Sequence, residues 1–174
     1  MSSCLLVIDV QKDFCKGGAL EVPSADAVVP TINTLLHSFG TSIASQDWHP
    51  PNHCSFVENG GDWPNHCVAG TNGAEFHERL ESHRFKAIVR KGTFRDNEAY
   101  SAFCDTGLHG LLKDLGITEV MVCGIATDYC VLATAMDAVK KFEVCVIADA
   151  CQGVSSKTTA EAFKKMKKAG IEII

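Results

Sequence analysis

Short, mostly apolar runs alternate along the chain with longer segments whose apolar residues recur at helical spacing. Short apolar runs bounded by polar residues or glycine are typical of strands that are buried on both faces of a sheet. We expect strands over residues 4–8, 42–45, 87–89, 119–123, 143–147 and 171–174. The amphipathic segments predict helices over residues 25–39, 107–115, 128–140 and 157–169.

Strands that alternate with helices predict an α/β fold, with a doubly wound, mainly parallel sheet of about six strands flanked by helices. Ser24 and Thr127 stand where they can cap the first and third helices. Gly116 and Gly170 follow helix ends, where a left-handed backbone is common. Neither a linker nor an internal repeat interrupts residues 1–174, so we expect a single domain.

The stretch from residue 46 to residue 93 breaks this alternation. It is rich in proline, glycine, asparagine and histidine, and it predicts mostly loop. A long ordered loop in a compact domain is usually functional. We therefore expect part of the functional site to lie here.

Composition narrows the class of protein. The chain of 174 residues is 46% hydrophobic and 21% charged with a net charge of -5, which is ordinary for a soluble globular protein. It has neither a basic stripe for nucleic acid nor an apolar run long enough to span a membrane. Nine cysteines without a CxxC pair argue against a disulfide scaffold and favour a reducing, cytoplasmic compartment. Parallel-sheet enzymes of this size often pair, so the sequence is compatible with a homo-oligomer.

Three polar residues stand at the carboxyl ends of predicted strands, where ligands bind in open α/β sheets. Asp9 ends the first strand, Lys91 follows residues 87–89, and Cys130 lies in the first turn of the predicted third helix. Each residue has an ordinary explanation: a turn former, a surface lysine and a small buried hydrophobe. Unpaired N–H groups and the dipole at a helix start, however, favour a thiolate, which is the form that attacks carbonyls. Together the three residues predict a centre that cleaves amides.

Asp47, His49 and His66 form a second candidate group. Residues i and i+2 of an extended strand point the same way, so Asp47 and His49 can bind one ion, and His66 can complete the site from the loop. Two histidines and a carboxylate suit Zn²⁺ or Fe²⁺. The pattern is short, and a pair of loop histidines without a metal is the alternative.

A third group is apolar. Phe14, Leu20, Trp63 and Tyr100 lie near these polar residues in the sequence or in predicted loops. Core packing would explain each of them. A flat aromatic substrate would also need such walls.

Taken together, these segments resemble the nicotinamidases of the isochorismatase-like cysteine hydrolase superfamily. The matching motifs occur in the family's order and span nearly the whole chain. They begin with Ile8-Asp-Val-Gln-Lys-Asp-Phe14, and continue with Gln46-Asp-Trp-His49-Pro, Trp63-Pro-Asn-His66-Cys, Lys91-Gly and Gly124-Ile-Ala-Thr-Asp-Tyr-Cys130.

The resemblance implies hydrolysis of nicotinamide to nicotinic acid and ammonia through a thioester on Cys130, as in NAD salvage, with pyrazinamide as a second substrate. It implies that Asp9 and Lys91 complete a catalytic triad. It also implies a cis peptide bond between Ile125 and Ala126, substrate contacts by both residues, and an oxyanion hole made by the N–H groups of Ala126 and Cys130.

The resemblance further implies that Asp47, His49 and His66 hold a divalent metal, which the pyridine nitrogen of the substrate approaches. Zinc is the favoured ion, and iron or manganese also fits the ligand set. We expect Ser55 to complete the site, directly or through water. His53, two residues earlier, is the alternative.

Two other functions remain open at this point. The first is hydrolysis of a different small amide by an enzyme of the same superfamily. The second is a redox-sensing protein, in which Cys123 or Cys151 would resolve an oxidised Cys130. That second function leaves Lys91 and the metal group unexplained.

Overall fold

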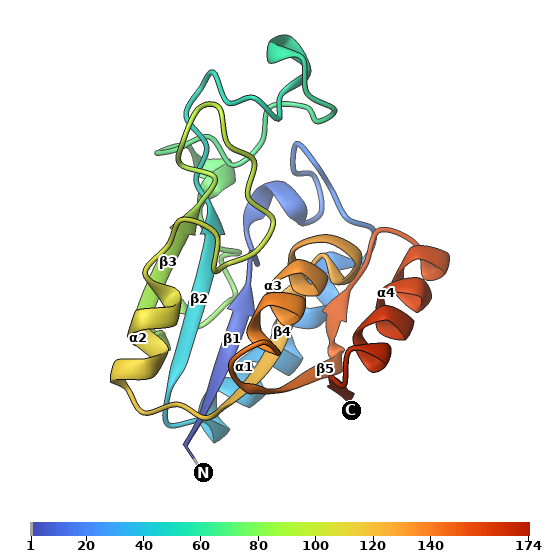
Figure 1. Ribbon diagram of the computed structural model, residues 1–174. Coiled ribbons are helices and arrows are strands. Elements are labelled where there is room, and N and C mark those ends of the chain that lie inside the picture. Colours follow the sequence, from blue (N-terminus) through green and yellow to red (C-terminus); the bar gives the residue numbers. More distant parts are fainter. Residues whose placement is uncertain (1) are drawn as a thin grey trace.

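A parallel sheet forms the centre of the computed structural model, which describes residues 2–174 (Figure 1). Six strands lie in the order β3-β2-β1-β4-β5-β6, and every neighbouring pair is parallel. The doubly wound parallel sheet predicted from the sequence is confirmed. The strands are β1 (Ser3–Ile8), β2 (Ser42–Asp47), β3 (Ala87–Lys91), β4 (Glu119–Ile125), β5 (Glu143–Gln152) and β6 (Glu172–Ile173).

Helices cover both faces of this sheet. Alternate residues of β1 point to opposite faces, so Leu5 and Val7 pack in the core on the side of α1, whereas Leu6 and Ile8 pack against the other helices. In Figure 1, α1 lies behind the sheet, and α2 and α3 lie in front of it. The helices are α1 (Val28–Ser38), α2 (Leu108–Asp114), α3 (Leu132–Ala138) and α4 (Ser156–Lys168).

The starts of two helices differ from the prediction. Ser24 does not cap the first helix, because its backbone is left-handed (φ 63°) and a short 3₁₀ turn precedes α1. Thr127 does not cap the third helix either: a π-helical turn, η6 (Thr127–Val131), precedes α3, and the buried Thr127 hydroxyl has no partner. The structure does contain a side-chain cap at Ser155, which accepts a hydrogen bond from the Thr158 N–H at the start of α4.

The last two strands also differ in length from the prediction. β5 continues five residues beyond residue 147, because it shifts register against β4 and pairs Cys151 with Gly124. β6 has only two residues. The predicted left-handed backbone at Gly116 and Gly170 is confirmed by φ angles of 67° and 85°.

The long segment between β2 and β3 lies beyond the carboxyl ends of the strands (Figure 1) and is mostly loop with short 3₁₀ turns, as predicted. The chain adds β2 and β3 on one side of β1 and then β4 on the other side. Such a reversal leaves a crevice at the carboxyl ends of the strands, where α/β proteins bind ligands. All nine cysteines, which lie within residues 2–174, carry free thiols. Each helix in the described part of the chain is too short or too polar to cross a bilayer.

Candidate active site

Asp9, Lys91 and Cys130 meet at the carboxyl ends of β1, β3 and β4. The Lys91 Nζ lies 2.9 Å from the Asp9 Oδ2 and 3.4 Å from the Cys130 Sγ. An Asp9 carboxylate oxygen lies within 4.8 Å of that sulfur. Asp9 and Lys91 are 0% and 1% exposed, and Cys130 is 6% exposed. The structure therefore brings the predicted carboxylate, cation and thiol into one water-poor corner.

Burial controls the charges in this corner. It raises the pKa of the Cys130 thiol well above its usual value, although Lys91 opposes the rise, and Asp9 and Asp47 add to it. The expectation that the helix start favours a resting thiolate is therefore wrong, because desolvation of the sulfur outweighs the nearby cation. Burial also raises the pKa of Asp9, again against the effect of Lys91. The thiol and the carboxyl group compete for a proton beside a fixed cation.

Lys91 stays charged despite its burial. Desolvation acts to lower its pKa, but Asp47 and Asp9 outweigh desolvation and raise the pKa well above its usual value. Its ammonium group also donates to the Ala99 carbonyl at 3.1 Å and to the Asp47 carboxylate. One cation thus links the predicted triad to the predicted metal group.

The turn that carries Cys130 begins with the predicted cis peptide bond between Ile125 and Ala126, which the structure contains. The Ala126 carbonyl accepts hydrogen bonds from the Tyr129 and Val131 N–H groups, both at 3.1 Å. These bonds close η6 and fix Cys130 at the end of β4. The side chain of Ile125 packs in the hydrophobic core and does not line the cavity, so the substrate contact expected of Ile125 would have to come from its backbone.

Asp47, His49 and His66 also come together. Ligand atoms of the three residues lie within 4.8 Å of one another. The Asp47 Oδ2 is 3.4 Å from the His49 Nε2 and 3.8 Å from the His66 Nε2. Desolvation acts to raise the pKa of Asp47, but Lys91, His49 and His66 together outweigh it and hold the pKa well below its usual value. A permanent carboxylate thus faces two imidazole nitrogens.

Hydrogen bonds on the far side of each ring orient these two histidines. The His49 Nδ1 donates to the Gly92 carbonyl at 2.9 Å, and the His66 Nδ1 donates to the Pro64 carbonyl at 2.7 Å. In the neutral form of each ring the lone pair is therefore on Nε2, on the side that faces Asp47. Metal-binding histidines usually have such a hydrogen bond on the ring nitrogen that does not bind the metal. Gly92 is required here: its φ is +62°, and a Cβ would lie 2.4 Å from the His49 ring. The donor set therefore fits a divalent ion.

His53 and Ser55 lie beside this group. The His53 ring stacks on the His49 ring with centroids 4.0 Å apart. Its Nε2 donates to the Asn97 carbonyl at 3.2 Å, so its Nδ1 accepts from the Ser55 hydroxyl at 2.7 Å. Both nitrogens of His53 are engaged, whereas the Ser55 oxygen keeps lone pairs free.

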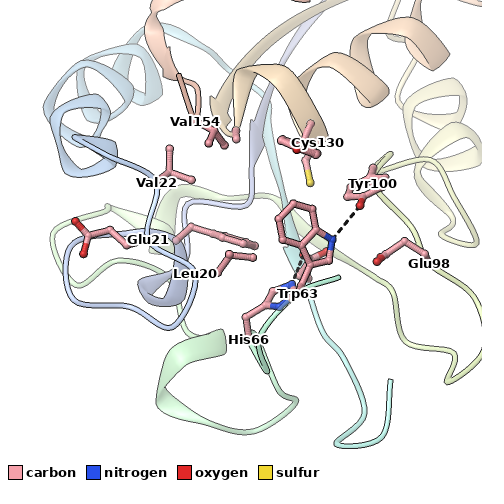
Figure 2. Close-up of a pocket in the computed structure, with 13 residues that line it drawn as sticks. Leu20, Glu21, Val22, Trp63, His66, Glu98, Tyr100, Cys130 and Val154 are labelled. Carbon is pink, nitrogen blue, oxygen red and sulfur yellow. Dashed lines mark hydrogen bonds and ion pairs between the residues drawn. The ribbon is translucent and has the colours of Figure 1, made fainter. Parts of the chain in front are cut away.

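The Cys130 sulfur points into an apolar cavity of about 120 Å³ (Figure 2). The predicted walls Phe14, Leu20, Trp63 and Tyr100 line it, together with Ala126. The Trp63 Nε1 donates to the Tyr100 hydroxyl at 3.1 Å. Asp47 and His66 of the metal group also reach this cavity. Nucleophile and metal ligands thus face one space of the size of a small molecule, since a single water needs only ~10–15 Å³.

Sequence reasoning missed several residues of this cavity. Tyr129 stands one residue before Cys130, and its ring meets that of Trp63 edge-on at 5.4 Å. Val154 follows β5, so the strand-end rule could have found it. Glu98 and the loop residues Glu21 and Val22 carry no comparable signal in the sequence. The missed lining residues are Glu21, Val22, Glu98, Tyr129 and Val154.

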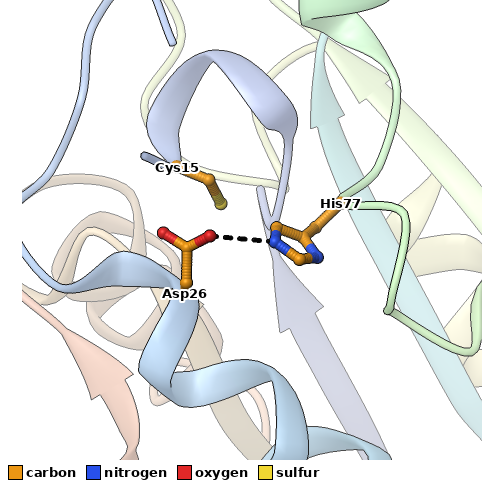
Figure 3. A group of neighbouring side chains, drawn as sticks. All are labelled: Cys15, Asp26 and His77. Atoms are coloured by element: carbon orange, nitrogen blue, oxygen red, sulfur yellow. Dashed lines mark hydrogen bonds and ion pairs between the residues drawn. The ribbon is translucent and has the colours of Figure 1, made fainter. Parts of the chain in front are cut away.

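Cys15, Asp26 and His77 form a second group of ligating side chains (Figure 3). Their ligand atoms are also within 4.8 Å of one another. The His77 Nδ1 accepts the Arg79 N–H at 3.2 Å, so its Nε2 carries the proton and donates to Asp26 at 3.0 Å. Because both nitrogens are engaged, His77 has no lone pair for a metal, and the group is a structural hydrogen-bonded link.

The cysteines proposed as resolving partners lie in other surroundings. Cys123 packs in the core on the α1 side of the sheet, whereas Cys130 packs on the opposite side. Burial raises the pKa of Cys123 well above its usual value and that of Cys151 to about 12. Neither thiol has the cation that a resolving cysteine needs to ionise.

Comparison with known proteins agrees with this geometry. Residues 3–174 match the isochorismatase domain model. The chain is 41% identical to a nicotinamidase of Acinetobacter baylyi, over 98% of this chain and 91% of that protein. It is 38% identical to a nicotinamidase/pyrazinamidase of Mycobacterium tuberculosis, over 98% of this chain and 97% of that one.

Solved structures give the same result. A pyrazinamidase of Pyrococcus horikoshii, in complex with zinc, superposes with a TM-score of 0.93 at 43% identity, covering 100% of this chain and 99% of that one. The protein PnC1 of L. infantum, in complex with nicotinate, has a TM-score of 0.96 at 40% identity, covering 99% of this chain and 92% of the other.

Proposed function

The chain belongs to the isochorismatase family, and we propose that it is a nicotinamidase that hydrolyses nicotinamide to nicotinic acid and ammonia. One observation carries the proposal: the Cys130 sulfur and two residues of the Asp47–His49–His66 group line the same aromatic-walled cavity. Nicotinamide has the matching features, a flat ring with a carboxamide at one position and a nitrogen lone pair at another. Relatives that are nicotinamidases at 38–41% identity support the same activity.

Asp9 is the proposed general base and acid. It takes the proton from the Cys130 thiol as the sulfur attacks the carboxamide carbon, and the electron pair of the carbonyl moves to oxygen. The N–H groups of Ala126 and Cys130 are the proposed donors to that oxyanion. Asp9 then gives its proton to the amide nitrogen, and ammonia leaves as the carbonyl re-forms.

The thioester left on Cys130 is hydrolysed in the second half of the reaction. Asp9 removes a proton from water as the water oxygen attacks the thioester carbon, and it returns a proton to the departing sulfur. Nicotinic acid is released and the thiol is restored. Throughout, the proposed role of Lys91 is to stabilise negative charge on Asp9 and on the sulfur, 2.9 Å and 3.4 Å from its Nζ.

Asp47, His49 and His66 are the proposed ligands of one divalent metal, and zinc is the proposed ion. The bound ion would supply a Lewis-acidic contact for the pyridine nitrogen of the substrate. The free Nε2 atoms and the charged carboxylate of this group support the assignment, as does the zinc complex of the Pyrococcus relative.

Ser55 is the proposed fourth residue of the metal site. Its hydroxyl donates to His53 and keeps lone pairs for the metal or for a bound water, whereas His53 has no free nitrogen. We expect Ser55→Ala to weaken zinc binding more than His53→Gln, measured by competition with a chromophoric chelator. The reverse order would assign the position to His53.

The activity is tested by measuring ammonia release from nicotinamide and pyrazinamide, with benzamide as a substrate that lacks the ring nitrogen. We expect steady turnover of the first two and little of the third. Rapid quenching followed by mass spectrometry should find the acyl group on Cys130. An adduct at any other residue, or no ammonia from nicotinamide, would overturn the proposal.

A further inference from the structure

The loop after β1 carries two polar side chains, one buried and one partly buried, that the proposed reaction does not use. They belong to the motif that begins with Asp9 and ends with Phe14. Gln11 is 0% exposed, and Asp13 is partly buried. Both side chains bind backbone groups of segments that carry the proposed metal ligands.

Gln11 binds both peptide groups of Asp47. Its Oε1 accepts the Asp47 N–H at 2.8 Å, and its Nε2 donates to the Asp47 carbonyl at 2.8 Å. The same Nε2 donates to the Ala74 carbonyl at 2.9 Å. A primary amide matches this need, because it offers an acceptor and two donors in one plane. The end of β2, and with it the carboxylate of Asp47, is thus fixed by one buried side chain.

Asp13 binds the residue that follows His66. Its Oδ2 accepts the Cys67 N–H at 2.7 Å. Cys67 has a left-handed backbone (φ 46°), a conformation that costs about 1–2 kcal/mol outside glycine. The Cys67 carbonyl in turn accepts the His49 N–H at 3.0 Å. One carboxylate therefore supports a strained residue that joins the segments of both histidine ligands.

Gly73 leaves the space that Asp13 occupies. A Cβ at this position would lie 2.2 Å from the Asp13 Oδ2. The other oxygen, Oδ1, accepts the Ala19 N–H at 3.2 Å, one residue before the cavity wall Leu20. The carboxylate is thus held by the Ala19 and Cys67 N–H groups and packs against Gly73.

We propose that Gln11 and Asp13 are positioning residues for the metal centre, Gln11 through the backbone of Asp47 and Asp13 through Cys67 between the two histidine ligands. This inference rests on the proposed metal ligands. The loop that supplies the proposed general base Asp9 would then also set the positions of the metal ligands. Residues that orient metal ligands from outside typically change metal affinity about 10–100-fold when they are replaced.

The test measures the zinc dissociation constant by chelator competition, without substrate, for Gln11→Met and Asp13→Asn. Methionine is close to glutamine in length but leaves the Asp47 peptide groups unpaired. We expect each variant to bind zinc about 10–100-fold more weakly than the wild type. Gly73→Ala is a further variant that removes no polar group and displaces the Asp13 carboxylate, so it should also weaken zinc binding.

Asp26→Asn is the matched control. Asp26 also accepts a hydrogen bond from a backbone N–H of this loop, that of Lys16 at 2.9 Å, but it does not bind a segment that carries a proposed metal ligand. This variant should lower the thermal midpoint and leave the zinc dissociation constant unchanged. Equal zinc affinity in wild type, Asp13→Asn and Gly73→Ala would overturn the inference while leaving the metal centre intact. A wild-type chain that binds no zinc would overturn the metal centre itself.

Discussion

Within residues 2–174, cysteine, aspartate and histidine side chains meet around Cys130 and around Cys15, and these two places differ in charge and in free lone pairs. Around Cys130, Lys91 opposes the effect of burial on the pKa of the thiol. Around Cys15, burial, Asp26, Glu78 and Glu21 all raise the pKa, to about 12. Burial thus raises the pKa of both thiols, but Cys130 has an ammonium group 3.4 Å from its sulfur, whereas the charged groups that act on Cys15 are carboxylates.

The histidines differ in the same way. His49 and His66 each spend one nitrogen on a backbone carbonyl and keep the other free. His77 accepts a backbone N–H with one nitrogen and donates to Asp26 with the other. Both groups line a cavity, so the difference between them lies in the ring nitrogens that the chain leaves without a hydrogen-bond partner. Geometric proximity alone does not distinguish the two places.

The largest effect should separate the two cysteines. Cys130→Ala removes the proposed nucleophile, and we expect ammonia release from nicotinamide to fall by at least about 10³-fold. Cys15→Ala removes a thiol that is 2% exposed, so it should cost about 1 kcal/mol of stability and leave kcat within about threefold. Steady-state ammonia assays and urea melts measure both. Substantial ammonia release by Cys130→Ala would show that Cys130 is not the nucleophile, and the two cysteines would then not differ in function.

The two aspartates give the next contrast. Asp9→Asn removes the group that must accept and return the proton, and general acid–base catalysis contributes about 10²–10⁴-fold. We expect a fall of that size in kcat, with folding checked by circular dichroism. Asp26→Asn should keep kcat because Asp26 touches neither the sulfur nor the cavity. Equal loss in both variants would mean that the carboxylate of Asp9 acts only in structure.

Replacing each of the two buried histidines, His66 and His77, should give a smaller difference, measured in zinc binding. His66→Ala removes a proposed ligand, and we expect zinc to bind at least about 10-fold more weakly. His77→Ala should leave the zinc content of the purified protein unchanged, because both ring nitrogens already have partners in the chain. Metal analysis after dialysis measures both variants. Zinc lost from His77→Ala alone would reverse the two assignments.

The comparison of these two regions also shows which features of the fold and of the site could be predicted from the sequence. Parallel order, element types and the meeting of Asp9, Lys91 and Cys130 follow from apolar periodicity and from the rule that polar residues at strand ends converge. Strand spacing predicted the group of Asp47, His49 and His66, and the family resemblance added the cis peptide bond; the structure contains both. Proximity of these residues was therefore predictable, although their catalytic roles remain proposals.

The remaining features depend on contacts made in the folded chain, which a local sequence pattern does not show. The sequence predicted a thiol biased to thiolate from the helix start, but desolvation in the folded chain decides the direction of the shift. Ser24 fails as a cap because its backbone is left-handed, which depends on the turn that follows. Gln11 and Asp13 were visible in a matching motif, but their partners lie 36 and 54 residues away.

The smallest effect concerns Asp26 and acid. The Lys16 N–H and the His77 ring hold the pKa of the Asp26 carboxyl below its usual value. Because the unfolded carboxyl binds a proton more readily than the folded one, this carboxylate stabilises the fold fully above about pH 4, the unfolded pKa. The contribution is lost as pH falls through the folded pKa. We expect Asp26→Asn to lower the free energy of unfolding by about 1 kcal/mol at pH 7.

That difference should shrink as urea melts are repeated from pH 5 down to pH 3.5, because the wild-type carboxyl then takes up its proton. The Cys130→Ala variant, melted at the same pH values, controls for acid effects at the other centre. A gap between wild type and Asp26→Asn that stays constant with pH would show that the carboxylate contributes through packing rather than charge. The Cys15–Asp26–His77 link would then be held by packing and not by the charge of Asp26.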